Sequence, residues 1–373
     1  MLGKRIAALL MALCTTVAAS GCWDAMDIND KALITLVVTD RQDGDFVFYM
    51  EVPNLSARSQ QESGGGEHYS IMKGAGRTYA IARGRLDTQM DKPIFLGTVR
   101  ALILTENLAR YDVKEYFYRM QTMVDYRRTL EVVTTRTSAQ DLVSVVPENN
   151  VSIGYSIDDT VSSLQEAGKV VVYTVSDVLE FIYSDQCFVL INMDAVDGNL
   201  AYTGYTVIQD GKMRGFIPLE EAWGLLWLLG DNISRMYTVD TGEYMSTLKV
   251  DGAGRKITPH FRNGQVSFDI SMSFHATMMY TSKNINFDEK QQAIVKGMLQ
   301  QQLLDNLSSN ISHSQEIGCD YLGFNKAFCI TYPNAAKQLN WTSAYQNAAF
   351  NISVSTELDP GGLLDTEAQG THQ

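Results

Sequence analysis

RKITPHFRNGQVSFDISMSFHATM, residues 255–278, contains two strand-like runs that meet at an Asn-Gly pair. The second run alternates between apolar and polar residues, which is typical of a strand that buries one face. Asn263-Gly264 is a favoured two-residue turn between antiparallel strands. The stretch therefore predicts a β-hairpin, and STLKV at residues 246–250 extends it into a meander.

Two further hairpins are predicted earlier in the chain. Asp43-Gly44 separates apolar runs at residues 33–38 and 46–52, and Asp210-Gly211 lies within YTVIQDGKMRGFI. Strands and helices alternate irregularly between them, which disfavours a doubly wound parallel sheet. The pattern predicts an α+β fold with mixed and antiparallel sheets flanked by helices. The 373 residues are enough for two or three domains.

Local signals predict where several helices begin. GAGRTY at residues 74–79 indicates a strand, a Gly-x-Gly turn and then a helix. Thr105 precedes ENLARY and is placed to cap a helix there. SAQD at residues 138–141 resembles a capping box, with Asp in place of the usual Glu.

A long amphipathic helix is predicted near residues 288–315. Its apolar face is formed by residues that recur every fourth position: Val295, Leu299, Leu303, Leu307 and Ile311. This face covers a sheet of its own domain or, in part, meets a partner protein. Gly318 is placed to end the helix.

The first 21 residues resemble a secretory signal peptide, with Lys4 and Arg5 before an apolar core. Small residues then precede Cys22 in the order Ala19-Ser20-Gly21-Cys22, which resembles a bacterial lipobox, although Leu is usual where Ala19 stands. Cys22 is therefore predicted to become the lipidated N-terminus of the mature chain. The alternative is plain secretion, with Cys22 an ordinary cysteine.

The predicted organisation has four parts. Residues 1–21 are the signal peptide, and residues 22–195 form an N-terminal α+β region that divides into two domains near 138–150. Residues 196–360 form a C-terminal α+β domain that contains the long helix. Residues 361–373 are predicted to be a flexible tail.

The charge balance excludes one class of partner. The formal net charge is -13, and a phosphate-binding surface needs clustered Lys and Arg, so nucleic acid is not expected as a ligand. The chain also has no polybasic segment for anionic lipid headgroups. A covalent lipid on Cys22 would supply membrane affinity without such a segment.

Three cysteines follow Cys22. Cys319 and Cys329 are ten residues apart and are able to pair in an oxidising compartment, whereas Cys187 would remain without a partner. No Cys-x-x-Cys is present, which disfavours a metal site.

No catalytic motif is apparent. G-x-S-x-G, H-E-x-x-H and G-x-x-x-x-G-K are absent, and GAGRTY lacks the third glycine of a dinucleotide fingerprint. The five histidines are scattered at positions 68, 260, 275, 313 and 372. The residues alone thus indicate an exported, lipid-anchored α+β protein that is not an enzyme and has no cofactor apart from the lipid.

Several blocks in a fixed order are similar to one known family. CWDAMDIN, directly after the lipobox, resembles the Cys-Trp-Asp opening of the Ger(x)C family of spore germination proteins, with Asp27 where Glu is usual. GAGRTYAIARGRL, the block from Phe95 to Thr135, EEAWGLLWLLGD and the stretch from DYLGFN to DPGG resemble later family blocks. The similarity covers roughly residues 20–362, with Ile81, Thr98 and Asn325 as departures from the usual residues.

This resemblance implies a function. Members are lipoprotein C subunits of GerA-type nutrient germinant receptors, anchored on the outer face of the inner spore membrane. They act with polytopic A and B subunits, have three α+β domains and no established enzymatic activity. The resemblance leaves open which nutrient is sensed and whether this subunit contacts it.

Two other classes of function compete with this one. An extracytoplasmic solute-binding lipoprotein of a transporter would show two α/β lobes around a cleft, which the antiparallel pattern disfavours. An exported hydrolase would need a convergent acid, base or metal site.

Overall fold

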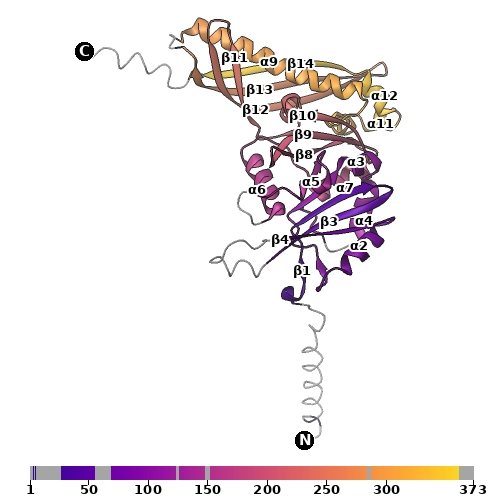
Figure 1. Ribbon diagram of the computed structural model, residues 1–373. Helices are drawn as coiled ribbons and strands as arrows, with labels where there is room; N and C mark the ends of the chain where they lie inside the picture. The colour runs from indigo at the N-terminus through magenta and orange to yellow at the C-terminus, as the bar shows by residue number, and fades with distance from the viewer. Residues whose placement is uncertain are drawn as a thin grey trace, which may run out of the picture.

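The computed structural model describes residues 3, 5, 27–54, 69–122, 126–147, 152–283 and 287–360. An eight-stranded sheet occupies the middle of the molecule, and a four-stranded sheet lies at the end opposite β1 (Figure 1). A small third sheet pairs β1 (Ala32–Leu33) with β5 (Ile94–Phe95) in parallel. The predicted α+β class is confirmed, since antiparallel hairpins and parallel pairs occur in the same molecule.

The eight-stranded sheet is parallel at its centre and antiparallel at both edges. Its order is β10-β9-β8-β7-β6-β2-β3-β4, with parallel pairing from β8 to β2. The strands are β2 (Leu36–Gln42), β3 (Asp45–Pro53), β4 (Tyr69–Gly76), β6 (Ala101–Thr105), β7 (Val132–Thr135), β8 (Phe188–Val196), β9 (Asn199–Gln209) and β10 (Lys212–Pro218). The predicted hairpins at Asp43-Gly44 and Asp210-Gly211 join β2 to β3 and β9 to β10, and all four turn residues have positive φ.

Helices cover both faces of this sheet. On one face, a single hydrophobic core contains residues of α2 (Tyr79–Asp87), α3 (Glu106–Tyr111), α4 (Lys114–Thr122) and α7 (Val175–Tyr183). On the other face lie α5 (Ala139–Leu142) and α6 (Ile153–Glu166). The short 3-10 helix η1 (Ile28–Asp30) precedes β1.

The predicted helix caps are confirmed, but the Gly-x-Gly turn is not. Thr105 and Ser138 accept hydrogen bonds from Leu108 N and Asp141 N at the starts of α3 and α5. Gly74 and Gly76 instead lie in β4, with α2 folded back onto them. A Cβ at Gly74 would come within 2.4 Å of the Ala82 carbonyl oxygen, so the glycines allow this close packing.

The four-stranded sheet has the order β11-β12-β13-β14. Its strands are β11 (Ser234–Asp240), β12 (Met245–Arg262), β13 (Gln265–Thr281) and β14 (Ala349–Asp359). The predicted turn at Asn263-Gly264 joins β12 to β13 in an antiparallel hairpin. The last strand, β14, runs parallel to β13 and forms one edge of the sheet.

Alternate residues of β13 form an apolar row beneath the helices. The buried residues of this row are Val266, Phe268, Ile270, Met272, Phe274, Ala276 and Met278. The helices of this part are η3 (Leu219–Glu221), α8 (Trp223–Leu229), α9 (Glu289–Glu316), α10 (Phe324–Thr331), α11 (Pro333–Ala336) and α12 (Trp341–Gln346). The longest of them, α9, runs along the sheet in Figure 1.

The predicted long helix and its apolar face are both confirmed. Asp288 caps α9 by accepting hydrogen bonds from Lys290 N and Gln291 N. All five residues of the four-residue repeat, Val295 to Ile311, are buried. Gly318 follows the helix with a φ of +64°. The face therefore covers the sheet of its own part of the chain.

A glycine lets α8 lie directly on α9. A Cβ at Gly224 would be 2.0 Å from the Asn306 carbonyl oxygen. Beside this contact, the Tyr237 hydroxyl accepts hydrogen bonds from Trp227 Nε1 at 2.9 Å and from Asn306 Nδ2 at 3.1 Å. The contact therefore fixes α8, α9 and β11 together.

A buried carboxylate fixes the start of α10. The Asp320 carboxylate accepts hydrogen bonds from Phe324 N at 3.0 Å, Asn325 N at 2.6 Å and the Trp341 indole at 3.1 Å. Burial raises the pKa of Asp320 to about 6, and these donors only partly offset it.

The α8–α9 contact predicts a strong effect of one methyl group. Gly224→Ala should lower the free energy of unfolding by about 1–3 kcal/mol, because the backbone of α9 must move. Gly297→Ala is the matched control, since a Cβ there meets nothing within 4 Å and Ala favours the helix. Urea unfolding of the three proteins measures both effects. Equal stability of the two variants would contradict the close contact.

The raised pKa of Asp320 predicts a pH dependence. The folded protein prefers the protonated acid, so this stabilisation is complete below the usual Asp pKa of 3.8 and is lost as the pH rises through about 6. Urea unfolding of the wild type and of Asp320→Asn between pH 4 and pH 7 measures this loss of stabilisation. From pH 4 to pH 7, the free energy of unfolding of the wild type should fall relative to that of Asp320→Asn by about 2–3 kcal/mol. A constant difference over this range would refute the assignment.

Candidate functional site

The predicted lipidation residue, Cys22, lies outside the described residues, which become continuous at Asp27. Asp27 caps η1 through a 2.9 Å hydrogen bond from Asn29 N. The Lys92 ammonium donates to the Asn29 carbonyl oxygen at 2.8 Å, and this bond holds η1 beside the segment that leads into β5. None of the helices within the described ranges is long and apolar enough to cross a bilayer.

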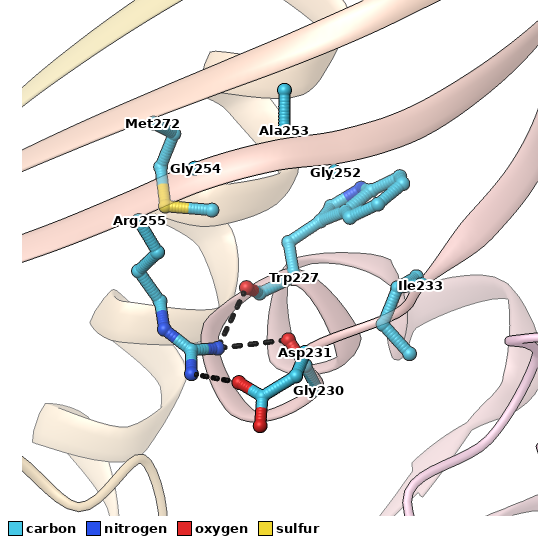
Figure 2. A pocket seen from close by; sticks show the side chains of 9 residues that line it. All are labelled: Trp227, Gly230, Asp231, Ile233, Gly252, Ala253, Gly254, Arg255 and Met272. Carbon is cyan, nitrogen blue, oxygen red and sulfur yellow. Dashed lines mark hydrogen bonds and ion pairs between the residues drawn. The ribbon is translucent and has the colours of Figure 1, made fainter.

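The family-like block EEAWGLLWLLGD forms η3 and α8 and ends beside a hollow of about 180 Å³ (Figure 2). On its far side β12 is irregular between Gly252 and Gly254. Trp227 packs edge-on against Phe274 of β13, with ring centroids 5.0 Å apart. The block is apolar because it fills the space between α9 and the sheet.

Arg255 closes this hollow, as Figure 2 shows. Its Nη1 donates to the carbonyl oxygens of Trp227 at 3.3 Å and Gly230 at 2.9 Å, and its Nη2 donates to Asp231 Oδ1 at 2.8 Å. The last carbonyls of a helix lack intrahelical donors, and the guanidinium supplies them here. Since the charge of Arg255 is already paired, the hollow joins α8 to β12 and offers no free group for chemistry.

Two buried carboxylates in the eight-stranded part also bind backbone groups. Glu51 Oε2 accepts hydrogen bonds from Ile153 N at 2.8 Å and Gly154 N at 3.3 Å, at the start of α6. Asp194 accepts from Arg136 N at 2.7 Å and from the Thr203 hydroxyl at 2.8 Å. Burial opposes ionisation of Asp194, but these donors outweigh it and hold its pKa below the usual range.

The described titratable residues do not assemble into a reactive cluster. No group of three or more potential metal ligands occurs within the described ranges. His260 lies 2.8 Å from Asp269 on the exposed face of the four-stranded sheet, and His313 Nδ1 lies 3.0 Å from the Tyr321 hydroxyl. These histidines belong to separate sites, and sequence spacing alone did not reveal their partners.

The cysteine pair suggested by spacing is not formed. Cys329 is exposed on α10 and lies 3.1 Å from Asn325 Oδ1, whereas Cys319 is buried. The Cys319 thiol lies instead beside Cys187, and this contact together with burial raises its pKa. The three described cysteines are free thiols, and the exposed position of Cys329 on α10 separates it from the buried Cys319.

Comparison with known proteins shows two family matches. Residues 24–195 match the family described as "Spore germination protein N-terminal domain". Residues 203–362 match "Spore germination B3/ GerAC like, C-terminal". The two matches meet inside the eight-stranded sheet, since β9, which follows the boundary at residues 195–203, pairs with β8 and β10 pairs with β9.

Individual relatives are distant but cover nearly the whole chain. The chain is 21% identical to "Spore germination protein KC" of Bacillus subtilis (strain 168), over 97% of each protein. It is 20% identical to "Putative spore germination protein YfkR" of the same organism, over 97% of this chain and 98% of the relative.

A solved structure shares the fold. "Crystal Structure of the GerBC protein" superposes with a TM-score of 0.59 and 15% identity, over 86% of this chain and 96% of that chain. With both family matches in the order expected from the sequence blocks, the chain belongs to the GerAC-like family of spore germination proteins, a family of C subunits.

Proposed function

We propose that this chain is the lipid-anchored C subunit of a spore nutrient germinant receptor. The observation that carries the proposal is the position of Cys22, which follows a signal-like segment and stands two residues before the family match begins at residue 24. The partners are polytopic A and B subunits, and the location is the outer face of the inner spore membrane. The role is non-catalytic.

The anchor has a physical rationale. Each buried methylene of an acyl chain contributes roughly 0.8 kcal/mol, and two chains give stable attachment where one does not. The protein has a formal net charge of -13, so an anionic membrane surface does not attract it. A covalent lipid on Cys22 therefore supplies the affinity that the surface charge cannot.

The solute-binding alternative is less compatible with the sheets. That class has two α/β lobes around one cleft. Here the central sheet is mixed, and the end sheet combines an antiparallel meander with one parallel edge strand. These features support the receptor subunit as the main proposal.

Acylation can be tested directly in sporulating cells. The wild-type chain should incorporate an alkyne-tagged palmitate, and the mature N-terminus found by mass spectrometry should be Cys22. Cys22→Ala should lose the label. Cys329→Ala is the matched control, since Cys329 is exposed but stands more than 300 residues after the signal segment in the sequence, and it should label like the wild type. Undiminished label on Cys22→Ala would contradict the anchor.

The receptor role predicts a selective germination defect. Spores lacking this chain should lose the response to one nutrient and keep the response to a non-nutrient trigger, measured by the fall in optical density. Restoring the wild type or Cys329→Ala should restore the response, whereas Cys22→Ala should restore it poorly. Normal responses to every nutrient, in a strain lacking its other nutrient receptors, would refute the role.

A further inference from the structure

A second and larger cavity lies where the two main sheets meet. Its volume is about 590 Å³, within the range of small-molecule sites. The end of α6 forms one wall, and the others come from η3, α8, the first residues of β11, and single residues of β9 and β12. A backbone hydrogen bond from Ser234 N to the Gly168 carbonyl oxygen, 3.0 Å long, joins these walls.

The close approach at this joint is built into the chain. Gly168 has a φ of +65°, and a Cβ there would lie 2.1 Å from the Asn232 carbonyl oxygen. The end of α6 therefore reaches the start of β11 only with glycine at this position. The cavity is a defined part of the fold because its opposing walls are held by backbone contacts.

The walls are mainly apolar and aromatic. Leu164, Leu219 and Met236 contribute aliphatic surface, and Tyr202 and Trp223 contribute rings. Trp223 is held edge-on against Tyr237, with ring centroids 4.7 Å apart. Such walls bury the apolar body of a ligand, while a small number of polar groups set its orientation.

Arg235 places a half-buried cation in this apolar surface. Its guanidinium carbon lies 4.2 Å from the centroid of the Trp223 ring. Burial lowers the pKa of Arg235, and the groups that oppose this shift are the tyrosines 202, 205 and 237 rather than any carboxylate. In the described part of the chain, the guanidinium has no ion pair with an acidic side chain.

Three other arginines have such a partner, whereas Arg41 and Arg119, within the described residues, are half-buried over aromatic rings without one. Arg255 bonds to Asp231 at 2.8 Å, Arg136 approaches Asp194 at 3.4 Å, and Arg100 approaches Asp158 at 3.5 Å. A charge removed from water requires compensation, and a guanidinium is shaped to bind a carboxylate through two parallel hydrogen bonds. Arg235 lies over the Trp223 ring and lines the cavity.

The other charged residues that line the cavity are positive, like Arg235. Lys169 and Lys249 also border the cavity, and no Asp or Glu is among its described lining residues. Lys249 is 3.3 Å from Asp251, so its charge is already compensated. Lys169 is exposed and adds positive potential at the cavity.

We propose that this cavity binds a small organic carboxylate with an apolar or aromatic body. The carboxylate pairs with the Arg235 guanidinium, and the body packs against Trp223, Leu219 and Leu164. Among the described lining residues, an α-ammonium group would meet basic side chains and no acid, so the site should prefer simple carboxylic acids to zwitterionic amino acids. This site goes beyond the receptor role and would bind its ligand whatever the role of the chain.

Titration calorimetry of the full-length lipoprotein in lipid nanodiscs tests the proposal. The probes are indole-3-acetate, phenylacetate and hexanoate, compared with indole-3-acetamide and L-tryptophan. At least one acid should bind, and indole-3-acetate should bind about tenfold or more tightly than its amide, as expected for a charge-assisted hydrogen bond. No binding of any acid up to 10 mM, or equal binding of acid and amide, would overturn the proposal.

Variants locate the binding. Arg235→Met should weaken acid binding by about 10- to 100-fold, and Arg235→Lys should weaken it less, because it keeps the charge but not the paired donors. Arg214→Met is the matched control, since Arg214 is exposed on β10 and pairs with Asp210 at 3.8 Å. If Arg235→Met does not fold, Arg235→Lys and Trp223→Phe decide: unchanged affinity in both would refute the site. Tighter binding of L-tryptophan than of indole-3-acetate would refute the predicted ligand class.

Discussion

The apolar row of β13 is the constraint on which the C-terminal half depends. Seven alternate side chains of one strand are buried, so one face of the sheet must be covered along its whole length. The 28-residue helix α9 is long enough to do this, and α8 fills the remaining space. Because Gly224 removes the side chain between the two helices, both can cover the same sheet. Gly224 and the apolar row of β13 therefore serve the same purpose, which is to let both helices cover one face of the sheet.

Three buried carboxylates of this molecule are compensated in the same way, and Arg235 lacks such compensation. Glu51, Asp194 and Asp320 each accept backbone hydrogen bonds and thereby fix α6, the end of β7 and α10. Arg255 likewise neutralises the end of α8. Compensation by local backbone groups is how a fold tolerates desolvated charge. Arg235 lines a cavity and has no acidic partner in the described part of the chain, and these two features together are why it carries a binding proposal and Arg255 does not.

Sequence patterns predicted features that depend on neighbouring residues. The Asp-Gly and Asn-Gly turns, the Thr105 cap and the face of α9 each follow from a local conformational or periodic preference. The prediction of a turn at the two glycines of GAGRTY is wrong, because these residues lie in β4 and let α2 pack on it, a contact that local sequence does not show. The parallel addition of β14, the separation of Cys319 from Cys329 and the cavity at Arg235 also depend on tertiary packing.

The proposed anchor limits where membrane partners can meet the body. Five residue steps separate Cys22 from Asp27, and an extended chain spans at most about 3.6 Å per residue, so the proposed acyl site would be within roughly 18 Å of Asp27, which caps η1. The four-stranded sheet lies at the opposite end of the molecule (Figure 1). With acyl chains in the bilayer, membrane-spanning subunits would therefore meet the end formed by η1, β1 and β5 first. The cavity lined by Arg235 lies further along the body, so a carboxylate from the aqueous side could enter it while the anchor stays in place.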